Sequence, residues 1–168
     1  MNEPALPEEK LYSTIADIIQ QARQQVRQAV NQQMVQAYWH IGRLIVEEEQ
    51  QGQARAEYGT QQLKRLSQRL QAEFGKGFDV TNLRNMRRFY LAFPIRDALR
   101  LELSWTHYRA LIGNENPLAR QWYADEAAQQ NWSTRALERQ IGKLYYERLL
   151  ASQDKALVEQ EAQEKTAP

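Results

Sequence analysis

The stretch from Thr81 to Arg88, TNLRNMRR, carries the side chains with the most specific chemistry in this sequence. At helical spacing Thr81, Arg84 or Asn85, and Arg88 fall on one stripe. Arginine can donate two hydrogen bonds to a guanine edge, and asparagine can form two with adenine, so the stripe is suited to reading a DNA major groove. Arg84 and Arg88 repel each other by roughly 0.2–0.5 kcal/mol in an isolated helix, and a bound phosphate or base would relieve that repulsion.

We therefore predict two sets of contacts to DNA. The side chains expected to face bases are Thr81, Asn82, Arg84 and Asn85. A second set is expected to face phosphates, which would position the protein without reading sequence. This set is Lys64, Arg69, Lys76, Arg87 and Arg88. The competing interpretation is that an arginine-rich helical face serves only solubility.

Two amphipathic segments joined by a short turn, residues 75–78, must present these residues. Their apolar positions recur at helical spacing and are expected to be buried: Leu63, Leu66, Leu70 and Phe74 in the first, and Leu83, Met86, Tyr90 and Phe93 in the second. Gly75 is suited to the left-handed residue that ends a helix, and Asp79 is a good N-cap for the next one. The pattern predicts a helix-turn-helix over residues 63–93, with the contact residues on its second helix.

The positive charge of the chain is concentrated in the same region. Residues 55–100 carry ten basic and four acidic side chains, a balance of +6. Residues 1–54 have a balance of −3 and residues 101–168 a balance of −2, so the net charge is only +1. A basic middle between acidic flanks attracts polyanions, although six surplus charges over 46 residues is not extreme.

The first part of the chain predicts one long helix. Apolar residues keep helical spacing from Leu11 to about Gln50, which corresponds to roughly 60 Å of helix. A helix of this length either kinks near Asn31 or Gly42, or projects and packs against a second chain. We therefore expect a homodimer. The acidic run Glu47–Glu49 at its end is expected to have a basic neighbour in the basic middle.

The remainder predicts further helices, each with a start signal. Ser104, Asn116 before Pro117, and Ser133 are expected caps, and the last helix is expected from Thr134 to about Ala151. The stretch Ala98–Leu103 is open to two interpretations, a short wing strand or a loop. The predicted fold class is thus all-α, a multi-helix domain with a long N-terminal helix and a central helix-turn-helix, with a winged-helix-like variant left open.

The expected organisation is a flexible N-terminus at 1–10, a helical domain at 11–151 and a polar tail at 152–168, either a frayed helix or disordered. The apolar content of 42% supports a folded core. Because there is no apolar run of membrane-spanning length and no export leader, a cytoplasmic protein without membrane contact is expected.

Catalytic chemistry has little support in the sequence. His40 and His107 lie in separate segments beside aromatic residues, and cysteine is absent, so neither a metal site nor a cofactor is predicted. Glu8-Glu9-Lys10 resembles the end of a metal-dependent nuclease motif but lacks the strand and the earlier aspartate. The four tryptophans and eight tyrosines coincide with apolar faces, so packing is favoured over base stacking.

Several blocks of the chain closely resemble the N-terminal domain of YhcG-like bacterial proteins, and together they cover about Leu11 to Ser152. The blocks are YWHIGRLIVEEEQQGQARAEYG, LSQRLQAEFGKGFDVTNLRNMRRFY, LSWTHYRALI, RQWYADEAAQQNWSTRALERQI and YYERLLAS. The resemblance implies a helix-turn-helix or winged-helix-like DNA-binding module, normally followed by a nuclease domain of the restriction-endonuclease-like fold. This sequence stops where that nuclease domain would begin, so the resemblance does not transfer catalysis.

The expected function is a non-catalytic DNA-binding module related to the targeting domain of a bacterial nuclease. One alternative is a protein-interaction module that assembles with a separately encoded nuclease or with another copy of the family. Another is a truncated gene product that has a fold but no retained role.

Overall fold

The structure is a computed structural model that describes residues 7–52, 56–152 and 155–166. These residues form helices and connecting turns, and none of them lies in a strand. The elements in chain order are α1 (Pro7–Gly52), α2 (Ala56–Phe74), the 3₁₀ turn η1 (Lys76–Phe78), α3 (Val80–Ala92), the 3₁₀ turn η2 (Arg96–Ala98), α4 (Trp105–Leu111), α5 (Pro117–Gln129), α6 (Thr134–Gly142), α7 (Tyr145–Ala151) and α8 (Lys155–Thr166). The prediction of an all-α chain with a long N-terminal helix is confirmed.

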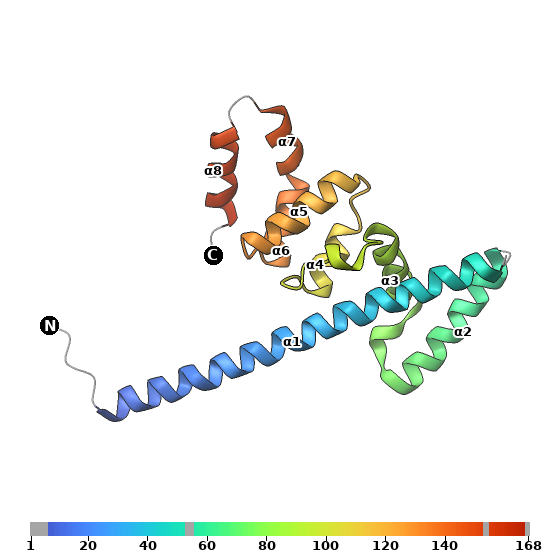
Figure 1. Cartoon of the computed structure of the whole chain (residues 1–168), viewed down its shortest axis with the longest axis horizontal. Coiled ribbons are helices and arrows are strands. Elements are labelled where there is room, and N and C mark those ends of the chain that lie inside the picture. Colours follow the sequence, from blue (N-terminus) through green and yellow to red (C-terminus); the bar gives the residue numbers. More distant parts are fainter. Residues whose placement is uncertain (1–6, 53–55, 153–154, 167–168) are drawn as a thin grey trace.

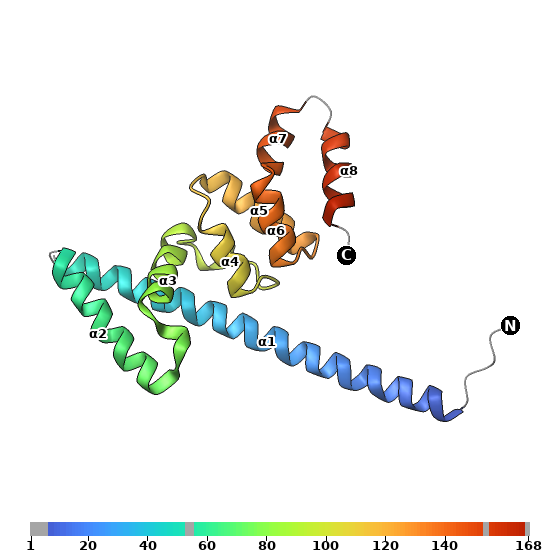
Figure 2. The ribbon, with the colours of Figure 1, turned by 180° about the vertical axis from the view of Figure 1, so that it is seen from behind.

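Helix α1 runs without interruption for 46 residues, about 69 Å at 1.5 Å per residue. It begins at Pro7, so residues 7–10, expected to be flexible, belong to it. Its C-terminal half packs on α3 and its N-terminal half projects away from the other helices (Figures 1 and 2). Of the two sequence alternatives, a kink and a projecting helix, the structure has the projecting helix.

Gly42 lies where α1 crosses α3. A Cβ atom placed on Gly42 would come within 2.0 Å of the carbonyl oxygen of Met86 and 3.2 Å of the Cβ of Tyr90. The sequence named Gly42 as a candidate kink, but α1 continues through it. The absence of a side chain here instead lets the two helix backbones come into contact.

Helix α3 is the centre of the core. Leu83, Met86 and Phe89 are fully buried. The Phe89 ring packs against Tyr108 of α4, and Phe93 follows immediately after α3. The indole of Trp39, on α1, donates a hydrogen bond of 2.7 Å to the Phe93 carbonyl. The aromatic residues of the sequence are therefore largely packing residues, as predicted.

The predicted caps are confirmed, because each depends on residues close in sequence. The Asp79 carboxylate accepts from the Asn82 backbone N–H at 2.7 Å. Ser104 forms a capping box with His107. The Asn116 side chain accepts from two backbone N–H groups at the start of α5, and Ser133 accepts from Ala136 at 3.1 Å. These caps fix where α3 to α6 begin.

The prediction of a single last helix from Thr134 to Ala151 is wrong. The helix breaks between α6 and α7, where Leu144 adopts a left-handed conformation with φ of 55°. Leu144 itself is 55% exposed. The break turns the buried Tyr145 against Trp122 and Trp132. Packing of these three rings outweighs the strain of one left-handed leucine.

Residues 98–103 are a 3₁₀ turn and a loop, so the loop interpretation is confirmed and the wing is not present. The buried Tyr108 hydroxyl ties this loop down, because it accepts from the Arg100 N–H at 2.6 Å and donates to the Arg100 carbonyl at 3.0 Å. Burial raises the pKa of Tyr108 above its ordinary value. The hydroxyl therefore stays protonated and keeps its donor role throughout the physiological range.

The polar segment after Ser152 differs from the expected frayed helix or disordered tail. Residues 155–166 form α8, whose Ala162 is buried and whose Val158 packs against the core. Glu161 on α8 pairs with Arg148 on α7 at 2.6 Å and also with Lys165. The small apolar positions spaced by four residues let an otherwise polar helix dock.

The Glu161 pairs should make the docking of α8 sensitive to acid. Hydrogen bonds from Lys165 and Arg148 lower the pKa of Glu161 from 4.5 to about 2. A depressed carboxyl pKa contributes stability that is complete above 4.5 and is lost as the pH falls towards 2. We expect faster amide hydrogen exchange in α8 across this window, after correction for the intrinsic rate. Glu161→Gln should exchange faster at neutral pH and lack the added acid dependence, and equal profiles for the two proteins would contradict the prediction.

Candidate nucleic-acid interface

Helix α3 has one face in the core and the opposite face outside. Leu83, Met86 and Phe89 form the buried face. At 100° per residue, Thr81, Arg84, Asn85 and Arg88 fall on the opposite side of the helix. We call these four residues the outer face of α3. Three of them are exposed and Asn85 is half-buried.

Within the described part of the chain, Thr81, Arg84 and Asn85 have no side-chain hydrogen bond or ion pair. Lys76, in the turn η1 just before α3, is also exposed and without an ion pair among the described residues. A guanidinium and an ammonium that the fold leaves unpaired keep their donors available for a ligand. Two accessible cations, Lys76 in η1 and Arg84 in α3, therefore lie close to the N-terminal end of α3.

Asn82 is used by the fold. Its amide nitrogen donates to the Gly77 carbonyl, and its amide oxygen accepts from the Trp105 indole N–H at 3.1 Å. The side chain therefore joins the turn η1 to helix α4. Both ends of this amide are thus engaged within the fold, which does not favour a base contact by Asn82.

Arg87 and Arg88, predicted to face phosphates, have different surroundings. Arg87 forms an ion pair with Glu49 near the end of α1, with Nε–O distances of 2.8 and 2.9 Å. This contact supplies the basic neighbour expected for the acidic run in the basic middle, whereas Glu47 pairs within α1, with Arg43 at 3.1 Å. Arg88 donates to the Ile112 carbonyl at 3.3 Å but remains exposed. Arg88 stays on the outer face, whereas Arg87 is directed to α1.

Lys64 and Arg69 lie on α2, where both are exposed. Arg69 lines a groove between α2 and the C-terminal third of α1. The structure therefore does not gather all the predicted phosphate contacts on one helix. Lys76, Arg84 and Arg88 belong to η1 and α3, and Lys64 and Arg69 to α2.

The groove between α1 and α2 is a feature that sequence reasoning missed. It has a volume of about 770 Å³ and a mainly apolar lining. Ile41 and Leu44 line it from α1, and Leu63 and Leu66 from α2. Leu66 and Phe74, expected to be buried, are 38% and 62% exposed. The available signal was that α1 and α2 both carry more apolar residues than one neighbour can cover.

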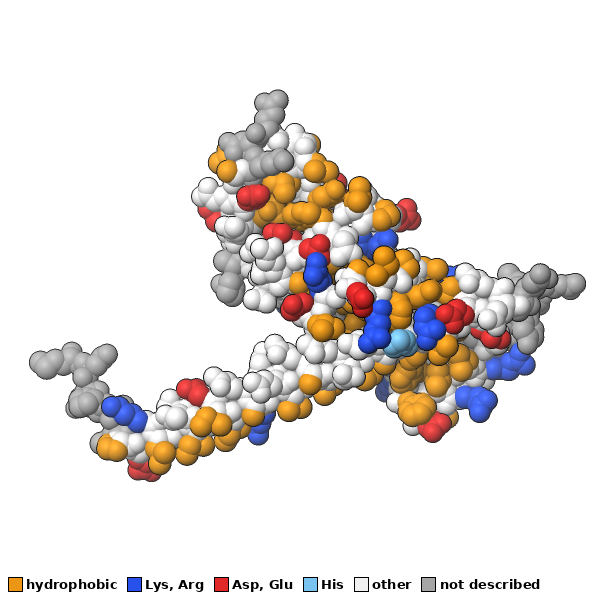
Figure 3. Space-filling model, in the orientation of Figure 1, with side chains coloured by type: hydrophobic (Ala, Val, Ile, Leu, Met, Phe, Trp, Pro, Cys, Tyr) orange, Lys and Arg blue, Asp and Glu red, His pale blue; other side chains and the backbone are white. Residues whose placement is uncertain are grey.

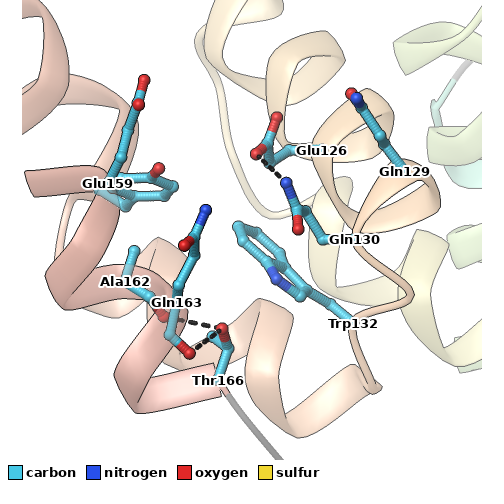
Figure 4. A pocket seen from close by; sticks show the side chains of 9 residues that line it. Glu126, Gln129, Gln130, Trp132, Glu159, Ala162, Gln163 and Thr166 are labelled. Atoms are coloured by element: carbon cyan, nitrogen blue, oxygen red, sulfur yellow. Dashed lines mark hydrogen bonds between the residues drawn. The ribbon is translucent and has the colours of Figure 1, made fainter. Parts of the chain in front are cut away.

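A second, smaller hollow of about 180 Å³ lies between α5, α7 and α8 (Figure 4). Glu126 and Glu159 line it beside the Trp132 ring, and none of the described lining residues is a lysine or arginine. Burial raises the pKa of Glu126. Since carboxylates repel phosphates, this hollow is not suited to nucleic acid.

His107 has a structural role. Its Nδ1 contacts the Ser104 N–H and hydroxyl at the start of α4, and its Nε2 lies 2.7 Å from the Trp132 carbonyl. His40 packs edge-on against Trp39. His107 thus acts in hydrogen bonding and His40 in packing. In the described ranges, no group of three or more acidic or histidine side chains could hold a metal ion, and no helix is long and apolar enough to cross a membrane.

Comparison with known proteins assigns the family. The family described as the DUF1016 N-terminal domain matches residues 14–148, which include α2, α3 and most of α1. The chain belongs to this DUF1016 family. It is 36% identical over 191 aligned positions to a protein of Escherichia coli (strain K12) named "Putative nuclease YhcG". The alignment covers 94% of the chain and 51% of that protein, so the chain spans about half the length of this curated relative. No solved structure matches the chain.

Proposed function

We propose that this DUF1016 N-terminal domain is a non-catalytic DNA-binding module that directs a bacterial nuclease activity to its substrate. The nuclease itself would belong to another domain or to a separately encoded partner. In this proposal α2, η1 and α3 act as a helix-turn-helix, with α3 as the helix that enters the major groove.

The observation that carries the proposal is the outer face of α3. Its residues lie opposite the buried Leu83–Met86–Phe89 face, and Arg84 is exposed without an ion pair among the described residues. In helix-turn-helix proteins the first turns of the second helix contact base edges. Thr81, Arg84 and Asn85 would therefore face bases, with Arg84 suited to guanine and Asn85 to adenine.

The phosphate contacts come from flanking cations. Lys76 precedes α3, Arg88 ends the outer face, and Lys64 projects from α2. Arg87 is left out because Glu49 neutralises it, and Arg69 because it lines the groove. The surplus of six positive charges in residues 55–100 and the nuclease name of the relative both support a polyanionic ligand.

A duplex titration at several salt concentrations tests the proposal. Lys64, Lys76 and Arg88 would neutralise three phosphates, so log affinity should fall with log salt at a slope of about −3. Fluorescence anisotropy of a labelled duplex measures both affinity and slope. The absence of binding at low salt, or binding without salt dependence, would refute the proposal.

The groove between α1 and α2 favours a second function, that of a protein-interaction module. Its exposed apolar lining is typical of a surface that binds protein rather than DNA. Co-purification with a nuclease in the absence of duplex binding would select this function. Duplex binding that requires Arg84 would select the first.

A further inference from the structure

The projecting half of α1 carries an uncovered apolar stripe. Its members are large side chains that are 37–75% exposed: Leu11, Tyr12, Ile15, Ile18, Ile19, Val26, Val30 and Met34. Figure 3 shows hydrophobic side chains in a row along this half of the helix. Charged residues are sparse there, because the 25 residues from 10 to 34 include only four of them: Lys10, Asp17, Arg23 and Arg27. A helix with this stripe gains by burying it against a partner.

The stripe is continuous with the groove between α1 and α2. At 100° per residue Val26, Val30, Ile41 and Leu44 lie within about 60° of one another around the helix axis. Ile41 and Leu44 line the groove, whereas Val35 and Val46 lie on another side of α1 and are buried. One uncovered surface therefore runs from Leu11 to the groove, about 50 Å along α1.

The size of this surface matches a stable interface. Two helices paired over about 50 Å bury on the order of 1,500 Å² in total, within the range of standard protein–protein interfaces. The largest exposed apolar patch on a typical monomer is only about 300–600 Å². The stripe and the groove together exceed what a monomer ordinarily leaves exposed.

We propose that a second copy of this chain covers the stripe, with the two α1 helices antiparallel, so that the N-terminal third of each fills the α1–α2 groove of the other. Such a contact uses the same surface on both copies and closes around a two-fold axis. The antiparallel direction follows from the geometry, because the uncovered helix lies at one end of the stripe and the groove at the other. A parallel pair would bring the two grooves together and leave both unfilled.

Charge favours the same arrangement. The groove is lined by Arg65 and Arg69 from α2 and by Glu48 and Glu49 from α1, of which Glu49 pairs with Arg87. The first turn of α1 carries Glu8 and Glu9, followed by Lys10. In the antiparallel pair the acidic first turn approaches the two arginines, whereas Lys10 lies on the opposite face of the helix, at the azimuth of Gln28. Opposite charges that meet at the rim fix the direction of pairing.

Light scattering on the full chain tests dimerisation, independently of DNA. Wild-type protein should have about twice the monomer mass of 19.7 kDa. Ile15→Asp with Ile18→Asp places two charges in the stripe and should raise the dimer dissociation constant at least about 100-fold. Gln24→Asp with Gln28→Asp adds the same charges on the opposite face and should leave the dimer intact. Monomeric wild-type protein, or a dimer that survives the stripe charges, would overturn the proposal.

Cross-linking tests the direction, because the chain has no cysteine of its own. Tyr12→Cys combined with Leu44→Cys, both at exposed positions, should give a covalent dimer with a short bis-maleimide. The two positions are about 48 Å apart within one helix, so the link must be between chains. Tyr12→Cys alone should stay monomeric on a denaturing gel. A cross-link through Tyr12→Cys alone would indicate a parallel pair and overturn the antiparallel arrangement.

Discussion

Replacing Gly42 with alanine is expected to destabilise the fold more than any other single methyl addition at a described glycine. The new Cβ would lie 2.0 Å from the Met86 carbonyl oxygen, so α1 and α3 must separate. Overpacking of this kind costs about 1–3 kcal/mol or more, and here the obstacle is backbone rather than a flexible side chain. A backbone obstacle places the cost at the upper end of this range, so after a gain of about 1 kcal/mol in helix propensity we expect a net loss of about 2 kcal/mol. Thermal unfolding should show a Tm lower by roughly 4–8 °C.

Gly59→Ala is the matched control for Gly42→Ala. Gly59 also lies within a helix, α2, but a Cβ there would meet nothing within 4 Å. Alanine should therefore stabilise the protein by up to about 1 kcal/mol through helix propensity alone. If Gly42→Ala were as stable as wild type, the close contact of α1 with α3 would not exist in solution.

Arg84→Ala is expected to have the largest effect on DNA binding. Arg84 is at the centre of the outer face of α3 and is unpaired among the described residues. A bidentate contact to a base contributes roughly 1–3 kcal/mol, so affinity should fall by a factor of about 5–150. The preference at one base position should also relax. Competition between duplexes that differ at single positions measures both effects.

Lys76→Ala and Arg135→Ala separate base reading from general charge. Lys76→Ala should weaken binding to all duplexes equally and reduce the salt slope by about 1. Arg135 is exposed on α6 and is not part of the proposed surface, so Arg135→Ala should change neither affinity nor slope. Equal losses from Arg84→Ala and Arg135→Ala would show that binding reflects net charge only.

Much of the fold could be predicted because it is local. The buried face of α3 follows from residues three and four apart, and the caps Asp79, Asn116 and Ser133 act on backbone groups within three residues. The break at Leu144 could not be predicted, because it depends on Trp122 and Trp132 packing on Tyr145. These contacts join residues 13 and 23 positions apart in the chain.

The same distinction applies to the candidate interface. Helical spacing is sufficient to place Thr81, Arg84 and Arg88 on one face of α3. It cannot show that the Asn82 amide accepts a hydrogen bond from Trp105, 23 residues away, or that Arg87 forms an ion pair with Glu49, 38 residues away. The base-facing and phosphate-facing roles of the remaining residues stay predictions until duplex binding is measured.

Because α1 is uninterrupted, its length sets both the distance and the rotation between its projecting end and α3. Every residue added to such a helix lengthens it by about 1.5 Å and rotates everything beyond it by about 100°. Seven residues inserted between Val30 and Val35 would move α3 about 10.5 Å from the projecting end at nearly the same phase, whereas five would rotate it by about 140°. The number of residues inserted into α1 could thus change the distance between its projecting end and the outer face of α3 separately from the rotation of that face about the α1 axis.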